Sequence, residues 1–449
     1  MLRRRPVLIV LAALVVALVV APEALAAAGG GSSGFGGGGG GGGHGSGEGI
    51  FWIFWFLIHL GPGGWLALGV IIVLIVVGLT VATLWARYVF AKKRSERQRR
   101  IALAAAEAAE DDPAFATDAV SRDAAALFLE AQAAWDSRDP AKLEQCVGGD
   151  LLVEWKRRLR DFDKKQWHNR VSVLGAPEIE YLGLVNKAGE VDDRIVVRVC
   201  ARIDDYVELA GGRTMLKKGQ TNKTVDLKEW WTLARRDGRW IVVSIESDTE
   251  GRHHLDAAIV ATPEGDDQTL RDASTLEVAQ DDAAPADVKT SEIADLDFDG
   301  DARAAALDLS LADARFAPDV LEVAVRRAVA GWAEAIDGAD DPLLAVAAPD
   351  VARQLLYPVG GNTRVVVRGP QVRHVRITNL DAAADPARMS VEVEVTGRRY
   401  VEDRDTAAVV SGSKDASSTF TEHWTLAIDG PPENPWRIVA AGQPARSAR

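Results

Sequence analysis

The sequence predicts an α+β chain in which two tandem domains, each made of helices followed by an antiparallel sheet, come after an N-terminal signal and a transmembrane helix. Three observations support this prediction. The segment EWWTLARRDGRWIVV at 229–243 is nearly repeated as EHWTLAIDGPPENPWRIV from residue 422. Residues 65–85 are uncharged and mostly apolar. Residues 1–26 combine three early arginines with an apolar run and an Ala-Leu-Ala ending.

The first 49 residues predict an export signal followed by a disordered segment. A basic start, an apolar run and a small-residue ending are the parts of a secretory signal, so residues 1–26 form a signal peptide cleaved near Ala26, or a signal anchor if they are retained. In the next segment, residues 27–49, fifteen of the twenty-one positions from Gly29 to Gly49 are glycine. Such a composition cannot bury enough surface to offset its chain entropy, which predicts disorder.

The hydrophobic region 50–86 contains the predicted transmembrane helix, residues 65–86. Twenty-one residues without a charge make a helix of about 31 Å, close to the thickness of the hydrocarbon core of a bilayer. Trp65 and Trp85 fit the aromatic belts at the two interfaces. Residues 50–60 are too short to cross alone, so we expect them in the interface or the outer leaflet.

The flanking charges predict the orientation of this span. Residues 87–112 are expected to form a basic juxtamembrane helix, and seven of the first fourteen residues are Lys or Arg. The glycine-rich side carries almost no charge. Because positive residues stay on the cytoplasmic side of a membrane, we expect the glycine-rich segment outside and everything after Arg87 in the cytosol.

The repeated hairpin belongs to a longer repeat that defines two domains, residues 113–250 and 310–445. DPAFATD from residue 112 and DARFAPD from residue 313 each lead into a helix that ends near a tryptophan. An Asp-Pro pair then opens a second helix in each domain, because proline is tolerated at the first helical position. The alternation in SVEVEV at 390–395 predicts a strand with one buried face. An internal duplication explains these matches.

An acidic linker, residues 251–309, is expected between the two domains. Residues 248–301 contain sixteen Asp or Glu and three Lys or Arg, a net charge of −13 that equals the formal charge of the whole chain. The same stretch has few large apolar residues. This composition predicts a mobile tether that keeps the domains soluble.

Motifs that would indicate catalysis or a cofactor are missing from the sequence. It contains no G-x-x-x-x-G-K-[ST] and no H-E-x-x-H, and its one G-x-S-x-G match, residues 30–34, falls in the low-complexity glycine-rich tract. The adjacent His253 and His254 point apart on a regular element, which argues against a metal site. Asp204 and Asp205 are the best enzymatic candidates, but a charged pair before a tyrosine at a strand end is typical of a turn. We therefore expect no enzyme, no cofactor and no bound metal.

The most suggestive polar segment is EWKRRLRDFDKKQWHNR at 154–170, with seven Lys or Arg and three acids. Trp155, Leu159 and Phe162 share one helical face, which core packing explains. The cations are either solvated or in contact with anionic headgroups, and in the second case Trp155 or Trp167 would lie at headgroup depth. One short patch does not favour nucleic acid as a partner. The candidate lipid-contacting residues are Arg87, Lys92, Lys93, Arg94, Arg97, Arg99, Arg100, Arg157, Arg158, Lys164 and Lys165.

The order of hydrophobic segment, glycine-rich tract, span, F-A-x-D helix and terminal E-x-W-T-L…W hairpin resembles the bacterial relatives of the translocase of the mitochondrial inner membrane, forty-four-kilodalton subunit. The resemblance covers about 113–250 well and about 313–442 less closely. It implies a cone-shaped fold of the nuclear-transport-factor-two-like type, membrane association, anionic-lipid contact and scaffolding of protein-handling machinery. The long N-terminal segment with which the mitochondrial protein engages chaperone and channel has no counterpart here, so its import-motor role is not carried over.

The leading functional hypothesis is a non-enzymatic scaffold in the bacterial cytoplasmic (inner) membrane that binds protein partners, anionic lipid or both from the cytosolic side. The first alternative is a lipid- or small-ligand-sensing module that uses the cavities of the cones. The second is an enzyme with an acid and a base in such a cavity, which the lack of a matched pair in both copies disfavours.

Overall fold

The structure is a computed structural model that describes residues 28–33, 35, 62–280, 296–298, 302–358 and 361–442. These residues fall into two compact units, one of residues 62–99 and one of residues 28–35 and 100–442. The expected signal (1–26), most of the expected disordered segment (27–49) and the apolar residues 50–61 lie outside the described part of the chain.

Helix α3 (Pro62–Asp111) is 50 residues long and joins the expected span to the expected juxtamembrane helix without a break. By length and composition, Val73–Asp111 could cross a membrane, with a mean hydropathy of 1.9 in its most apolar window. The residues after Arg87 are mainly Ala, Leu, Lys, Arg, Glu and Gln, which are strong helix formers. The helix ends where Asp112 caps the short 3₁₀ helix Pro113–Phe115, with its side chain accepting from the amide of Ala114.

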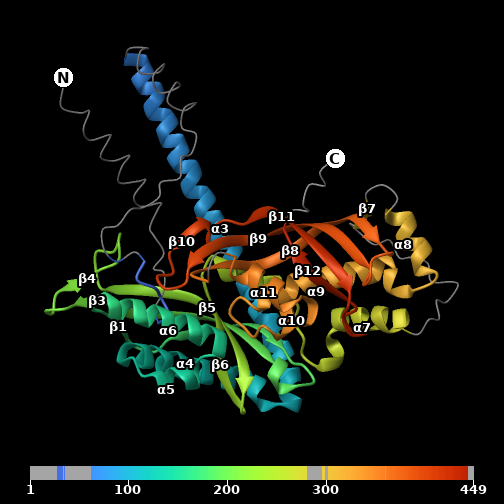
Figure 1. The fold of residues 1–449 in the computed structure, drawn as a ribbon. Coiled ribbons are helices and arrows are strands. Elements are labelled where there is room, and N and C mark those ends of the chain that lie inside the picture. The colour runs from blue at the N-terminus through green and yellow to red at the C-terminus, as the bar shows by residue number, and fades with distance from the viewer. Residues whose placement is uncertain are drawn as a thin grey trace. The chain divides into compact units, whose positions relative to one another are not determined.

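The first half of the larger unit (residues 101–255) places helices on one side of an antiparallel sheet (Figure 1). Strands β1, β3, β5 and β6 are hydrogen-bonded in that order, and β2 and β4 pair with β3. The elements are α4 (Thr117–Ser137), α5 (Pro140–Cys146), α6 (Gly149–Lys164), β1 (Trp167–Val173), β2 (Glu178–Val185), β3 (Arg194–Leu209), β4 (Thr214–Met215), β5 (Thr224–Arg236), β6 (Arg239–Ser247) and the 3₁₀ helix Glu250–Leu255.

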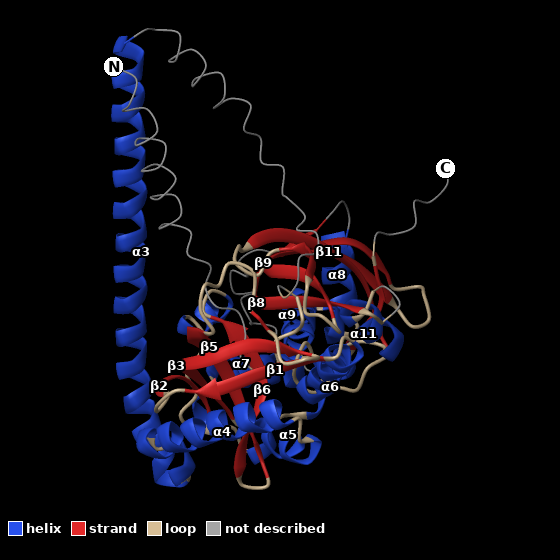
Figure 2. Cartoon of the chain, turned by 90° about the vertical axis from the view of Figure 1, so that its left-hand side faces the viewer, coloured by secondary structure: helices blue, strands red, loops and turns tan. Residues whose placement is uncertain are grey.

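The second half (residues 267–442) has the same order of helices and then strands (Figure 2). Its sheet runs β12-β11-β9-β8-β7, with β10 paired to β9 and β7 parallel to β8. One long strand, β8, occupies the place that β1 and β2 share in the first half. The elements are α7 (Asp267–Gln280), β7 (Leu296–Phe298), α8 (Ala302–Ser310), α9 (Pro318–Glu334), α10 (Asp341–Val346), α11 (Pro349–Leu356), β8 (Thr363–Asp381), β9 (Arg388–Asp403), β10 (Val409–Gly412), β11 (Ser418–Ile428) and β12 (Trp436–Ala441).

The repeated hairpin has the same irregularity in both halves. The strand pairing shifts register between Thr232 and Leu233 in the first half and between Thr425 and Leu426 in the second. Such a shift is a β-bulge, which bends a strand and increases its twist. The Trp-Thr-Leu motif therefore marks the position where each terminal hairpin bends.

The F-A-x-D motif meets the end of that hairpin in both halves. Phe115 packs edge-on against Trp240 and Phe316 packs edge-on against Trp436, in each case with 5.6 Å between ring centroids. Aromatic pairs prefer this geometry because the positive ring edge meets the negative ring face. In both halves these motifs thus correspond to one contact between the short 3₁₀ helix that precedes a long helix and the last strand.

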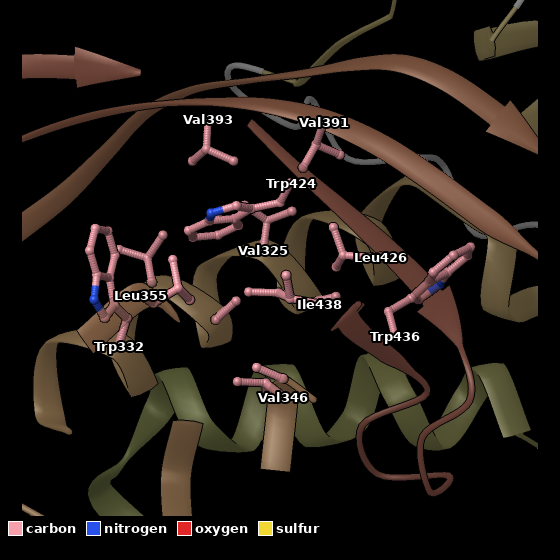
Figure 3. Close-up of a cluster of buried hydrophobic side chains, with 14 of the residues drawn as sticks. Val325, Trp332, Val346, Leu355, Val391, Val393, Trp424, Leu426, Trp436 and Ile438 are labelled. Carbon is pink, nitrogen blue, oxygen red and sulfur yellow. The ribbon is translucent and has the colours of Figure 1, made fainter. Parts of the chain in front are cut away.

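Aromatic and aliphatic side chains fill the space between helices and sheet. In the first half Trp135 packs edge-on against Trp155, and Phe128 lies 5.2 Å from Trp231 between ring centroids. Figure 3 shows the second core, where Trp332 and Trp424 lie among valine, leucine and isoleucine side chains. Tryptophan side chains are thus part of the core between helices and sheet in both halves.

The expected linker, 251–309, contains more regular structure than its composition predicts. Helix α7 lies within it, Leu276 belongs to the second core, and Asp272 forms an ion pair with Arg326 of α9 at 3.2 Å. Helix α8 also lies within it and contributes Ala306 to that core. The acidic composition did not predict these two helices, because a few spaced apolar side chains are enough to reach the core and the buried acid Asp272 is compensated by Arg326. Residues 281–295 lie outside the described part.

Candidate functional site at the junction of the two halves

Charged side chains from both halves meet in a buried network. Arg158 of α6 contacts Glu402 of β9 at 3.0 Å, and Glu402 contacts Arg364 of β8 at 2.7 Å. Arg364 then contacts Asp337, 2.7 Å away, in the turn after α9. All four side chains are buried. The charges alternate along this path, which is the arrangement that buried charges require to offset their loss of hydration.

The ionisation of this network follows from its contacts. Burial alone would raise the pKa of the Glu402 carboxyl, but Arg364, Lys414 and Arg158 hold that pKa well below its usual range. Likewise, burial opposes ionisation of Asp337, yet Arg368 and Arg364 keep its pKa lowered. Both carboxylates are therefore charged at neutral pH, and each depends on its arginine partners.

Two of the candidate lipid-contacting residues are used in this junction, so the sequence-based assignment needs correction. Arg158 is 8 % exposed and also donates to the backbone oxygen of Gly29. Arg157 pairs with Asp405 of the second half at 2.8 Å. Their carboxylate partners lie more than 240 residues away in the sequence, and periodicity within one helix does not reveal them. In this structure neither guanidinium faces outward toward headgroups.

The hypothesis that Trp155 lies at headgroup depth is wrong. Trp155 is 1 % exposed and packs against Trp135, so it is a core residue of the first half. Phe162 is fully buried on the same helical face, and Leu159 packs against the same cluster, as the periodicity predicted. Trp167 is partly exposed at the start of β1, where the ammonium of Lys165 lies 5.4 Å from its ring centroid.

All of the remaining candidate cations except Arg94 and Arg97 are exposed. Lys164 is the last residue of α6, and Lys165, just after it, contacts Asp161 at 2.7 Å. In α3, Arg94 is partly exposed and Arg97 is buried. The exposed cations of α3 are Arg87, Lys92, Lys93, Arg99 and Arg100.

A short piece of the glycine-rich segment, Ala28–Phe35, packs into the junction, which departs from the expected disorder at these residues. The amide of Ala28 donates to Gln132, and the amide of Ser33 donates to the backbone oxygen of Thr406 at 3.0 Å. Phe35 lies edge-on to Phe162. The small residues fit where larger ones cannot: a Cβ on Gly29 would lie 2.3 Å from the indole of Trp155, and Gly29 has φ +85°.

The acidic pair Asp204-Asp205 lies on β3 and not in a turn. Asp204 contacts Lys223 at 2.7 Å and accepts from Thr224, and hydrogen bonds from these two groups lower the pKa of its carboxyl. Asp205 contacts Lys217 at 2.8 Å and accepts from Asn169. Both carboxylates have structural partners, and a lowered pKa is the opposite of what a general acid needs.

The adjacent histidines do not point apart. His253 and His254 lie in the 3₁₀ helix after β6, and the Nε2 atom of each lies within 3.1 Å of Oε2 of Glu246. Their ring centroids are 4.0 Å apart. The expectation failed because a tight turn, unlike a strand or a long α-helix, brought neighbouring side chains toward a common acid.

The two cysteines, Cys146 and Cys200, are both free thiols. Cys146 is buried and Cys200 is partly buried. Burial is the main cause that raises the pKa of each thiol. A raised pKa keeps a thiol protonated and unreactive at neutral pH.

Comparison with known proteins identifies the first half. Residues 101–247 match the family model of the Tim44-like domain. Similar solved structures include the intermembrane space region of chloroplast protein ARC6, at 10% identity and a TM-score of 0.23, covering 28% of this chain and 95% of that one. Another is an Ntf2-like protein involved in plasmid conjugation, at 9% identity and a TM-score of 0.19, covering 72% and 94%. No curated protein matches the chain. The relationship shown is therefore that of residues 101–247 to the Tim44-like domain.

Proposed function

We propose that this protein is a membrane-anchored, non-enzymatic scaffold whose larger unit binds protein partners at the cytoplasmic face of a bacterial inner membrane. The observation that carries the proposal is the order of elements along the chain. A helix able to cross a membrane runs directly into a Tim44-like domain at residues 101–247. The family is one of membrane-associated scaffolds for protein handling, so the anchor and the domain support the same function.

We also infer that the second half arose by duplication of the first. The bulge at the Thr-Leu step, the Phe–Trp edge contact and the order of helices and strands recur in both halves. A parallel bridge from the residue after a short helix to the last strand also recurs, as Val147 with Val242 and Ala347 with Ile438. These features concern both backbone pairing and side-chain packing, and a shared ancestor accounts for all of them.

The place where we expect a partner to bind is the surface that Ala28–Phe35 covers. A chain that crosses the membrane once between Phe35 and Arg87 carries Ala28–Phe35 to the side opposite residues 113–445. In that inserted state the same surface is exposed on α6 and on the loop after β9. Its contacts with Ala28–Phe35 support an occupant of similar form: a segment of small residues in turns, followed by an aromatic residue.

A photo-crosslinking amino acid at Lys165 tests this proposal, because Lys165 lies on that surface and contacts Ser32. The matched control is Arg160, an exposed residue of α6, the helix that ends just before Lys165. In inverted native membrane vesicles we expect position 165, and not 160, to form adducts with other proteins. A synthetic peptide of sequence AGGGSSGF (residues 28–35) should suppress these adducts.

Three outcomes would contradict the proposal. Adducts that form equally at both positions would show no specific surface. Adducts that the peptide leaves unchanged would show binding elsewhere. Adducts of position 165 only with residues 28–35 of the same chain would place that segment on the cytoplasmic side and exclude a single crossing.

A further inference from the structure

Three side chains from adjoining elements converge at the edge of the first half. Glu246 lies at the end of β6, and the following 3₁₀ helix, Glu250–Leu255, carries His253 and His254. This helix lies close to β5, since a Cβ on Gly251 would be 2.1 Å from the side chain of Trp230. The imidazole of His254 stacks on the same indole at 5.9 Å. The backbone path and the stacking therefore fix the direction of His254.

The distances among the three side chains match those of a metal site. The Nε2 atoms of His253 and His254 lie 3.0 Å and 3.1 Å from Oε2 of Glu246, and the ligand atoms of all three residues lie within 4.8 Å of one another. In a tetrahedral zinc site with bonds of 2.0–2.2 Å, neighbouring ligand atoms are separated by about 3.3 Å. Small rotations of the rings are enough to admit an ion between them.

An ion can reach this cluster from solvent. Neutral imidazole and ionised carboxylate are the states in which these groups bind metal. Both rings are partly exposed, 23% for His253 and 15% for His254, which gives an ion access from solvent.

One cation, Arg368 of the second half, approaches this cluster. Its Nε lies 3.5 Å from Oε1 of Glu246, on the carboxylate oxygen that His254 does not contact. Its terminal nitrogen pairs with Asp337, so the charge of Arg368 is largely compensated within the second half. The Oε2 atom of Glu246 thus remains directed at the two imidazoles.

We propose that Glu246, His253 and His254 form a binding site for a zinc-class divalent ion at the junction of the two halves. Two imidazoles and one carboxylate are a ligand set that proteins use for zinc and neighbouring transition metals. The site is independent of the scaffold proposal, because it depends only on residues of β6 and the 3₁₀ helix. Bound metal ties that helix to the sheet beside the second half.

The full-length chain, purified in detergent with an affinity tag free of histidine and stripped with chelator, tests the proposal by equilibrium dialysis against Zn²⁺ at neutral pH. We expect about one tight equivalent per chain. The double variant His253→Ala/His254→Ala and the single variant Glu246→Gln should each weaken binding by on the order of 100-fold or more. The control His423→Ala removes a histidine that faces one carboxylate, Glu392 at 3.6 Å, and should bind as the natural chain does.

A second measurement needs no variant. Co²⁺ added to the stripped natural chain should produce visible absorption bands of a low-coordinate site with nitrogen ligands, and Zn²⁺ should remove them. Absence of tight Zn²⁺ binding and of these bands in the natural chain would overturn the proposal. Equal Zn²⁺ affinity of the Glu246→Gln, double-histidine and natural chains would overturn it as well.

Discussion

At the scale of single residues, Glu402 is the centre of the junction. It is 1 % exposed and faces three cations, Arg158, Arg364 and Lys414. We predict that Glu402→Gln lowers the free energy of unfolding by about 3–5 kcal/mol, because the buried guanidinium groups lose their counter-charge. Urea unfolding of a soluble chain that begins at Arg87 measures this loss. As a control, Glu392→Gln removes a partly exposed ion pair with Arg376 and should lower the free energy of unfolding by only about 0–1 kcal/mol. Equal losses for the two variants would contradict the prediction.

The lowered pKa of Glu402 predicts that acid destabilises the folded protein. The pKa of this carboxyl is lower in the folded chain than the usual value of 4.5 that it recovers on unfolding. The unfolded state then binds the proton more readily, so this contribution to stability is complete above pH 4.5 and is lost as the pH falls below it. In unfolding titrations from pH 6 to pH 3, Glu402→Gln should show a shallower decline than the natural chain. Parallel curves would mean that Glu402 does not carry the effect.

Residues whose partners are close in the sequence were predictable, and those of the junction were not. The spacing of Trp155 and Phe162 identified a core-facing stripe because one helix turn determines it. Arg157 and Arg158 look like surface cations on the same helix, yet they pair with Asp405 and Glu402. A charge pattern does not reveal a partner in another domain.

At the scale of elements, α7 is the clearest difference between sequence and structure. An acidic composition suggested a mobile tether, but Leu276 lies in the second core and Asp272 contacts Arg326. A helix needs only one apolar stripe to pack, and an average over fifty residues conceals it. The strand periodicity of SVEVEV, by contrast, placed Val391, Val393 and Val395 correctly in the core.

We therefore predict that limited proteolysis leaves α7 attached to the second half. The C-terminal fragment should begin before residue 272, and Leu276→Asp should move its start beyond α7 by removing the apolar contact. Mass spectrometry of the fragments reads both boundaries. A natural fragment that begins after residue 300 would contradict the packing of α7.

The two fragments should also elute together in gel filtration, since the Arg158–Glu402 and Arg404–Glu154 pairs connect them.

At the scale of the whole molecule, the cations after the span are proposed to hold the protein near anionic lipid. Each exposed Lys or Arg near such a surface contributes about 1 kcal/mol, and the attraction weakens with salt. We predict that the soluble chain from Arg87 binds vesicles containing phosphatidylserine and releases them as salt rises. Replacing Arg87, Lys92, Lys93, Arg99 and Arg100 by Gln should abolish binding. The control replaces Arg157 and Arg158, which the junction uses, by Gln and should reduce vesicle binding little; a loss as large as that of the α3 variant would point away from α3.

The central claim is that one crossing separates the N-terminal segment from the unit that contains the Tim44-like domain. Impermeant maleimide labelling of two single-cysteine chains, Ser33→Cys and Ser417→Cys, tests it most directly in a background with Cys146→Ala and Cys200→Ala. The account predicts that intact cells label position 33 at once and position 417 only after the membrane is permeabilised. Labelling of both positions in intact cells, or of neither, would place the two segments on the same side and contradict a single-span scaffold.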